Sequence, residues 1–102
     1  MKIDSLMEIL PQNYSVVDRD LILRAYRFAE KAHQGQKRAS GEPYVSHCIA
    51  VASILAELRV PPAVVIAGLL HDTVEDTSVT LEDIQREFGD EISKLVDGVT
   101  KL

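Results

Sequence analysis

The sequence has few of the residues that characterise disulfide-rich, disordered or membrane-spanning chains. A single cysteine, Cys48, in 102 residues rules out a disulfide framework. Glycine and proline are sparse, with five and four residues, and 46% of the chain is apolar, which excludes an intrinsically disordered protein. No apolar run approaches the roughly 20 residues of a membrane-spanning helix. The first ten residues, MKIDSLMEIL, carry acids and lack a small-residue cleavage site, so we expect no signal peptide, no membrane contact and a cytoplasmic protein.

Basic charge is also in short supply, and the charges that are present are segregated. The net charge of −5 argues against a general nucleic-acid-binding protein. Residues 24–38 hold five basic side chains against one acid, a local +4, whereas residues 70–91 hold eight acids against one arginine, a local −7. Most of these charges are expected on solvated helix faces. A sharper interpretation is a basic lip beside an acidic pocket, which suits an anionic ligand next to a metal ion.

Apolar residues recur at helical spacing along the sequence, and no pair of segments has the pattern of a β-hairpin. In the clearest case Leu21 and Ala25 share one face of a helix predicted over residues 18–34, which Gly35 can end. The segment 36–44 contains Ser-Gly and proline and is predicted as a loop. Further helices are predicted over residues 46–58, 63–76, 81–88 and 90–102. We therefore expect one all-α domain, or a piece of one, with short connections.

Capping residues and prolines indicate where these helices begin and end. Ser46 is a candidate N-cap for the second of them. Pro61 and Pro62 separate that helix from the next, because proline is tolerated in a first turn. The helix after these prolines is apolar all round in its first half, so we expect it at the buried centre of the bundle. Thr80 with Asp83 resembles a capping box before the following helix.

Five polar side chains near the ends of these helices are the candidates for chemistry. His47 shares a helix face with an apolar stripe, so we expect it to point into the core. That stripe comprises Val51, Ile54, Leu55 and Leu58. His71 lies on the side of Glu75, because positions four apart stack on a helix. Asp72 lies on the side of Asp76 for the same reason.

Carboxylates at the ends of buried helices need a partner, because an unpaired buried charge costs on the order of several kcal/mol. A bound divalent cation would supply that partner. Imidazole together with carboxylate suits Mn, Fe, Zn or Co, with no sharp choice among them. Such a metal would polarise a phosphoryl oxygen and lower the pKa of a bound water, and Glu75 and Asp76 would handle protons beside it.

Each of these residues also has a purely structural interpretation. A lone core histidine is usually a hydrogen-bonded packing residue, an isolated His-Asp pair is common, and two acids after a helix are more often a solvated helix end. The combination favours a metal site, because every member is expected on the inward side of adjacent helices. His33, at the edge of an apolar face, is expected to pack or hydrogen-bond there. Cys48 is expected to be a small buried residue and not a nucleophile.

Three ordered segments together resemble a known family. They are AHQGQKRASGEPYVSH (Ala32 to His47), LLHDTVEDT (Leu69 to Thr77) and FGDEISKLVDGVTKL (Phe88 to Leu102). The chain resembles the hydrolase domain of RelA/SpoT-type (p)ppGpp synthetase/hydrolases, a branch of the HD-domain superfamily. The resemblance implies that residues 1–102 are the N-terminal part of an all-α HD-domain helical bundle, truncated at its C-terminal side. It also implies that the synthetase and regulatory domains of longer members are absent.

The resemblance implies a role for each candidate residue. A Mn²⁺ ion would be held by the side chains of His47, His71 and Asp72. Glu75 and Asp76 would activate water and handle protons. The loop residues Arg38 and Ser40 would face the nucleotide, and Ala39 stands where many members have a second basic residue. Because the chain keeps the His-Asp pair, the resemblance places it with the hydrolase-competent members.

The reaction implied is metal-dependent hydrolysis of the 3′-pyrophosphate of (p)ppGpp, giving GDP or GTP and pyrophosphate, in the stringent response. The parent chain is also a candidate (p)ppGpp synthetase. One departure concerns the fourth metal ligand, an aspartate that the family carries downstream of the VDGVTKL segment, beyond Leu102; Asp97 matches a structural position instead. We therefore expect the 102 residues alone to be weak or inactive and to self-associate as a homo-oligomer.

Two alternative functions stay open on the sequence. One is another HD-superfamily phosphohydrolase that acts on a different nucleotide, which nucleotide hydrolysis assays would separate from the first. The other is a helical signalling or interaction module without turnover. The retained histidines and acids argue against this second alternative for the parent protein, but not for these 102 residues with an incomplete site.

Overall fold

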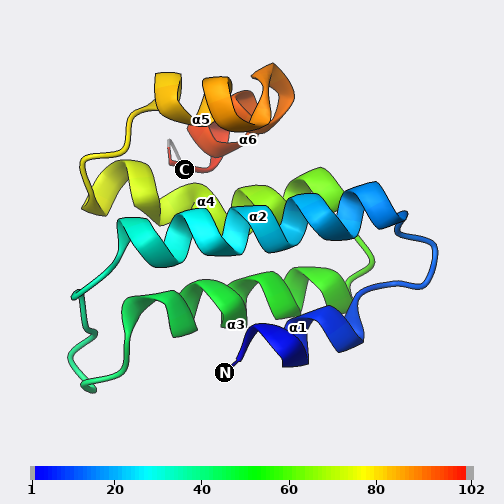
Figure 1. Ribbon diagram of the computed structural model, residues 1–102, viewed down its shortest axis with the longest axis horizontal. Helices are drawn as coiled ribbons and strands as arrows, with labels where there is room; N and C mark the ends of the chain where they lie inside the picture. The colour runs from blue at the N-terminus through cyan, green and yellow to red at the C-terminus, as the bar shows by residue number, and fades with distance from the viewer. Residues whose placement is uncertain (1, 101–102) are drawn as a thin grey trace.

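The computed structural model describes residues 2–100, which contain six α-helices joined by loops (Figure 1). In chain order they are α1 (Ile3–Ile9), α2 (Val16–Ala32), α3 (Tyr44–Glu57), α4 (Pro62–Asp76), α5 (Leu81–Phe88) and α6 (Asp90–Thr100). The predicted all-α class is confirmed. None of these helices is long and apolar enough to cross a membrane.

Helix α4 is the centre of the bundle, as its all-round apolar sequence predicts. It packs against α2, α3 and α6, and Figure 1 shows it running beside α2 between the α1–α3 layer and the α5–α6 pair. Its side chains from Val65 to Leu70 are all buried. Gly68 lets α3 approach closely, since a Cβ atom there would lie 2.6 Å from the Leu55 Cδ1 atom. The helix that carries the His-Asp pair is therefore the most enclosed element.

Side-chain caps set the start of two helices. The Thr80 hydroxyl accepts a hydrogen bond from the Asp83 N–H at 3.2 Å, and the Asp83 carboxylate accepts one from the Thr80 N–H at 3.0 Å. This capping box confirms the prediction, with aspartate doing the work of the usual glutamate. The same arrangement joins Ser15 and Asp18, so α2 begins at Val16, two residues before the predicted start.

The start of α3 differs from the prediction. Ser46 is not its N-cap, because α3 begins at Tyr44 and Pro43 occupies the N-cap position. The loop before it is tied down by a backbone bond from the Tyr44 N–H to the Gln36 carbonyl at 3.0 Å and by a single antiparallel bridge between Lys37 and Pro43. The fixed φ of proline and this tether set the first turn earlier. Tyr44 thereby becomes a helix residue that faces α4.

Helix α3 buries only part of the face predicted for it. Val51 and Leu55 are half-buried beside Gly68 of α4. Ile54 and Leu58, expected in the core with His47, are 62% and 68% exposed. The helix instead buries a row of mostly small residues: Cys48, Ile49, Ala52, Ser53 and Ala56. Small side chains allow α3 to lie close to α1 and α4, and that close approach overrides the larger apolar stripe. His47 consequently lies at the flank of α3, with its side chain 28% exposed.

Helix α1 was not predicted from the sequence. The acids in its stretch argued against a signal peptide, but Leu6 is completely buried and Leu10 nearly so. The helix packs on α3 and α2 (Figure 1). A short amphipathic helix is therefore the structural use of this segment.

We expect Ser15→Ala to lower the free energy of unfolding by about 1 kcal/mol, because the Asp18 N–H at the start of α2 loses its acceptor. Ser15→Gly should cost only a few tenths of a kcal/mol, since glycine tolerates the cap position. Urea unfolding followed by circular dichroism measures both. An unchanged free energy of unfolding in Ser15→Ala would show that the hydroxyl does not stabilise α2.

Candidate functional site

The polar residues selected from the sequence gather where the last turns of α4 meet the first turn of α3. Asp72 is the most enclosed of them, with 12% of its side chain exposed. His71, its neighbour on α4, has 20% of its side chain exposed. Helix α3 brings Tyr44 and His47 to the same place, and the two rings meet edge to face at 5.7 Å. The packing of α3 on α4 thus assembles residues that lie far apart in the sequence.

The Asp72 carboxylate lies between two imidazoles. Its Oδ1 atom is 3.0 Å from the Nε2 atom of His71, and its Oδ2 atom is 3.9 Å from the Nε2 atom of His47. His71 and Asp72 are in direct contact, as predicted. The His47 Nε2 atom is about one ångström too far from the Asp72 carboxylate for a hydrogen bond.

The hydrogen bond of the His71 Nδ1 atom shows that this nitrogen carries a hydrogen. The Nδ1 atom lies 2.8 Å from the carbonyl oxygen of Gly68, which can only accept, so Nδ1 carries the hydrogen. The Nε2 atom of His71 lies 3.0 Å from the Asp72 carboxylate. Two acceptors in contact repel one another unless a proton or a metal cation lies between them. The α4 backbone thus fixes the imidazole in the tautomer that can ligate a metal.

Tyr44, which was not predicted as a site residue, hydrogen-bonds to both aspartates of α4, Asp72 and Asp76. Its hydroxyl lies 2.9 Å from Oδ2 of Asp72 and 3.1 Å from Oδ2 of Asp76, so one proton is shared between two carboxylates. Burial, followed by the hydrogen bond to Asp72, raises the pKa of Tyr44 above its usual range, and the hydroxyl stays a donor. The available signal was its place in the quoted loop segment, together with two aspartates four residues apart.

The loop between α2 and α3 brings Arg38 to the site. The Arg38 N–H donates to the Glu42 carbonyl at 2.9 Å and the Gly41 N–H donates to the Arg38 carbonyl at 2.8 Å, which closes a tight turn. Gly41 allows this turn because its φ of +88° is unfavourable for other residues. The Arg38 Nη1 atom lies 2.9 Å from Nδ1 of His47. Ser40 is exposed within the turn.

A sequence model of the HD domain family matches residues 25–102. Among curated proteins the chain is 63% identical over 81 residues to a GTP pyrophosphokinase of Streptomyces coelicolor, covering 79% of this chain and 10% of that protein. It is 46% identical over 100 residues to the bifunctional (p)ppGpp synthase/hydrolase SpoT of Escherichia coli, covering 97% of this chain and 14% of that protein. The chain belongs to the HD domain family, in its RelA/SpoT branch.

Comparison with solved structures supports the same assignment. A structure of a metazoan ortholog of SpoT, which hydrolyses ppGpp and plays a role in starvation responses, matches with a TM-score of 0.73 and 36% identity. The match covers 78% of this chain and 47% of that chain. A further curated relative is the guanosine-3′,5′-bis(diphosphate) 3′-pyrophosphohydrolase of Vibrio cholerae, 44% identical over 99 residues and covered to 14% of its length. The chain thus spans 10% to 14% of the length of these curated relatives.

HD domains typically bind a divalent metal ion, and the donors present here fit one in their chemistry. His71 offers a lone pair beside a buried carboxylate. His47 is different, because the Arg38 guanidinium can only donate and therefore faces an unprotonated Nδ1 atom. Neutral His47 then carries its hydrogen on Nε2, and it must exchange Arg38 for another partner before Nε2 can ligate. Accordingly, no group of three ligand-type side chains among residues 2–100 is preassembled around a metal position.

Glu75 and Asp76 do not lie on the inward side that the sequence analysis gave them. Both are exposed in this HD domain, and in Figure 1 the last turn of α4 extends past the ends of α2 and α3. Asp76 is nevertheless fixed by Tyr44 on the side of Asp72, as the four-residue spacing predicts. The prediction is therefore wrong about the burial of these two acids but right about the side of α4 on which Asp76 lies. The two acids stand at the open edge of the site, where a proton can pass to water.

The remaining candidates have structural roles. His33 is 2% exposed and hydrogen-bonds through Nδ1 to Gln36, as expected. Cys48 is completely buried. Burial, followed by the charge of Asp72, raises the pKa of Cys48 to about 12, so the thiolate that a nucleophile needs does not form near neutral pH.

We expect Cys48 in the folded HD domain to resist alkylation by iodoacetamide at pH 8, because a pKa near 12 leaves almost no thiolate. Raising the pH should speed the reaction only when it reaches the raised pKa or unfolds the chain. Mass spectrometry follows the modification, and Cys48→Ala with Ser78→Cys provides an exposed thiol as control. Equal rates for the two thiols would contradict the burial of Cys48.

Proposed function

We propose that this HD domain removes pyrophosphate from the 3′ position of (p)ppGpp in a Mn²⁺-dependent hydrolysis. The observation that carries the proposal is the buried Asp72 carboxylate, which lies 3.0 Å from the Nε2 atom of His71 with His47 on its other side. A cation between these groups would stabilise the arrangement. The proposal is supported by the activities in the names of the relatives, namely 3′-pyrophosphohydrolase in Vibrio cholerae and ppGpp hydrolysis by the metazoan ortholog.

His71, Asp72 and His47 would hold the metal. Asp72 needs no rearrangement for this role, because Tyr44 already orients its carboxylate. His47 would ligate once Arg38 leaves its Nδ1 atom. A bound divalent ion would polarise a phosphoryl oxygen and lower the pKa of a bound water. The family resemblance adds a fourth ligand, an aspartate from outside these 102 residues.

The exposed acids would manage the protons of the hydrolysis. The oxygen of water bonds to the phosphorus next to the ribose, the bond from that phosphorus to the 3′ oxygen breaks, and the water oxygen leaves within pyrophosphate. One proton must leave the water and one must reach the ribose oxygen. Glu75, exposed at the end of α4, is placed to accept the first. Asp76, held by the Tyr44 hydroxyl, would stay fixed beside it.

Arg38 would exchange partners when the nucleotide binds. Its guanidinium is exposed and bonded to one imidazole nitrogen, whereas a phosphate offers it a charge-assisted bidentate pair. Residues 24–38 carry a local charge of +4, which favours an anion on this side of the site. Ser40, in the same turn, would add a hydroxyl contact.

The proposed reaction is tested by incubating the chain with ppGpp and saturating Mn²⁺ and separating GDP and pyrophosphate by ion exchange. We expect slow or no turnover by the 102 residues alone. A chain extended to the length of the solved relative should turn over clearly, because it would add the aspartate that is the fourth metal ligand. Asp72→Asn in the extended chain is the inactive control. Equal rates for the 102-residue chain and the extended chain would contradict the proposed set of metal ligands.

We expect Tyr44→Phe to weaken Mn²⁺ binding by about 10-fold, because the Asp72 carboxylate loses the donor that orients it. The ring stays, so packing on His33 is kept. Isothermal titration calorimetry gives the dissociation constant. Tyr26→Phe is the matched control, since the Tyr26 hydroxyl donates to Glu30 on the surface of α2. The orienting role would be refuted by two variants with the same affinity.

We expect Arg38→Ala to raise KM for ppGpp by about 10-fold or more while the protein keeps its metal. Removing the guanidinium frees Nδ1 of His47, so Mn²⁺ affinity should be unchanged or higher. Steady-state kinetics in the extended chain, together with metal analysis, separates the two effects. Arg27→Ala, at an exposed position on α2, is the control. A loss of bound metal in Arg38→Ala would mean that Arg38 supports the metal site.

A further inference from the structure

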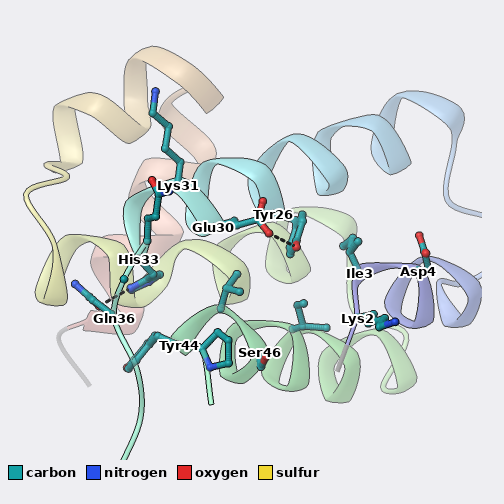
Figure 2. A pocket seen from close by; sticks show the side chains of 15 residues that line it. Lys2, Ile3, Asp4, Tyr26, Glu30, Lys31, His33, Gln36, Tyr44 and Ser46 are labelled. Carbon is teal, nitrogen blue, oxygen red and sulfur yellow. Dashed lines mark hydrogen bonds between the residues drawn. The ribbon is translucent and has the colours of Figure 1, made fainter. Parts of the chain in front are cut away.

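Behind Tyr44 lies a polar unit formed by the buried His33 and the half-buried Gln36. The His33 ring is 2% exposed and stacks on the Tyr44 ring, with centroids 4.6 Å apart and planes inclined by 26°. Its Nδ1 atom lies 2.9 Å from Oε1 of Gln36, the contact drawn as a dashed line in Figure 2. The unit thus connects the end of α2 to the first turn of α3.

The direction of each hydrogen bond in the unit is fixed by one backbone carbonyl. The Asp76 carbonyl oxygen, at the end of α4, can only accept, so the Gln36 Nε2 group donates to it at 2.8 Å. The Gln36 Oε1 atom therefore faces His33 as an acceptor, and His33 must carry its hydrogen on Nδ1. The Nε2 atom of His33, which has no partner, then holds only a lone pair, which is easier to leave unpaired than an N–H group.

Packing alone does not account for this unit. An apolar side chain at position 33 would fill the space without the cost of burying a polar ring. His33, Gln36 and Tyr44 also line a cavity of about 710 Å³, seen in Figure 2. Gln36 and Tyr44 are half-buried beside it, and hydrogen bonds and ring stacking connect them to the buried His33. His33 stacks on Tyr44, whose hydroxyl donates to Asp72, and Gln36 donates to the Asp76 carbonyl. The unit therefore contacts both aspartates of α4 through one intermediate group each.

We propose that His33 and Gln36 are positioning residues that set the Asp72 and Asp76 carboxylates for metal binding and hydrolysis. The inference rests on the proposed function for its activity readout, but not for its structural one. Gln36 holds the end of the α4 backbone, and His33 orients both Gln36 and the ring of Tyr44. Neither residue touches substrate or metal.

Three variants separate the contacts. Gln36→Glu keeps an acceptor for His33, removes the donor to the Asp76 carbonyl and adds a negative charge. His33→Phe keeps a stacked ring and removes the donor to Gln36. His33→Asn places an amide N–H at the position of Nδ1 and removes the ring, so it should rescue part of what His33→Phe loses. Gln34→Glu, an exposed change in the same loop, is the control for added charge.

The readouts are Mn²⁺ affinity by calorimetry, kcat and KM in the extended chain, and nitrogen-15 NMR of His33 in the 102-residue chain, all below the melting temperature of each variant. We expect Gln36→Glu and His33→Phe to lose about 10-fold in Mn²⁺ affinity and in kcat with KM nearly unchanged. His33→Asn should lie between them and the wild type, and Gln34→Glu should match the wild type. NMR should show the His33 hydrogen on Nδ1.

Two results would overturn the proposal: a hydrogen on Nε2 of His33, or wild-type Mn²⁺ affinity in both Gln36→Glu and His33→Phe. Failure of the proposed function would give a different result. The wild-type extended chain would bind Mn²⁺ but release no pyrophosphate, and the Mn²⁺ affinities of the variants could still be compared with that of the wild type. If the wild type bound no Mn²⁺, the carboxyl carbon-13 shifts of Asp72 and Asp76 would decide instead. Shifts unchanged in Gln36→Glu would then reject the positioning role.

Discussion

The structure depends on one buried carboxylate, that of Asp72 on the central helix. A charge in such a place costs on the order of several kcal/mol unless it is paired. Tyr44 supplies a hydrogen bond at 2.9 Å and His71 a contact at 3.0 Å. The His71 contact lies within α4, whereas the Tyr44 bond depends on the first turn of α3 lying against the end of α4. The fold therefore serves to keep this carboxylate enclosed and oriented.

The positive charge that Asp72 needs is only partly present in the chain itself. Arg38 comes near, but it is bonded to His47 and not to the carboxylate. His71 places its Nε2 atom beside Asp72 and becomes a favourable neighbour only through a proton or a cation. The site thus has the electrostatics of a metal centre whose histidine on α3 is engaged elsewhere. In the proposed function a metal ion would bind His47 and a phosphate would bind Arg38, so both would act on the same hydrogen-bonded pair.

Much of this could be predicted from the sequence, where the signal is local. Helical spacing predicts α2, α4, α5 and α6, and the Thr80 box marks the start of α5. Ser15 carries the same signal for α2 and could have been found. The exposure of Ile54 and Leu58 on α3 could not, because it depends on how α3 packs against α1 and α4. Tyr44 escaped prediction for the same reason, since its partner Asp72 lies 28 residues away on α4.

The central claim, that Asp72 is the middle of a divalent metal site, is tested most directly by adding substoichiometric Mn²⁺ to the isotope-labelled chain and following paramagnetic line broadening by NMR. Broadening should be strongest at Asp72, His71 and His47, fall off with distance from them, and disappear in Asp72→Asn. Broadening centred instead on the acidic surface of α5, at Glu82 and Glu87, and surviving in Asp72→Asn would contradict the claim.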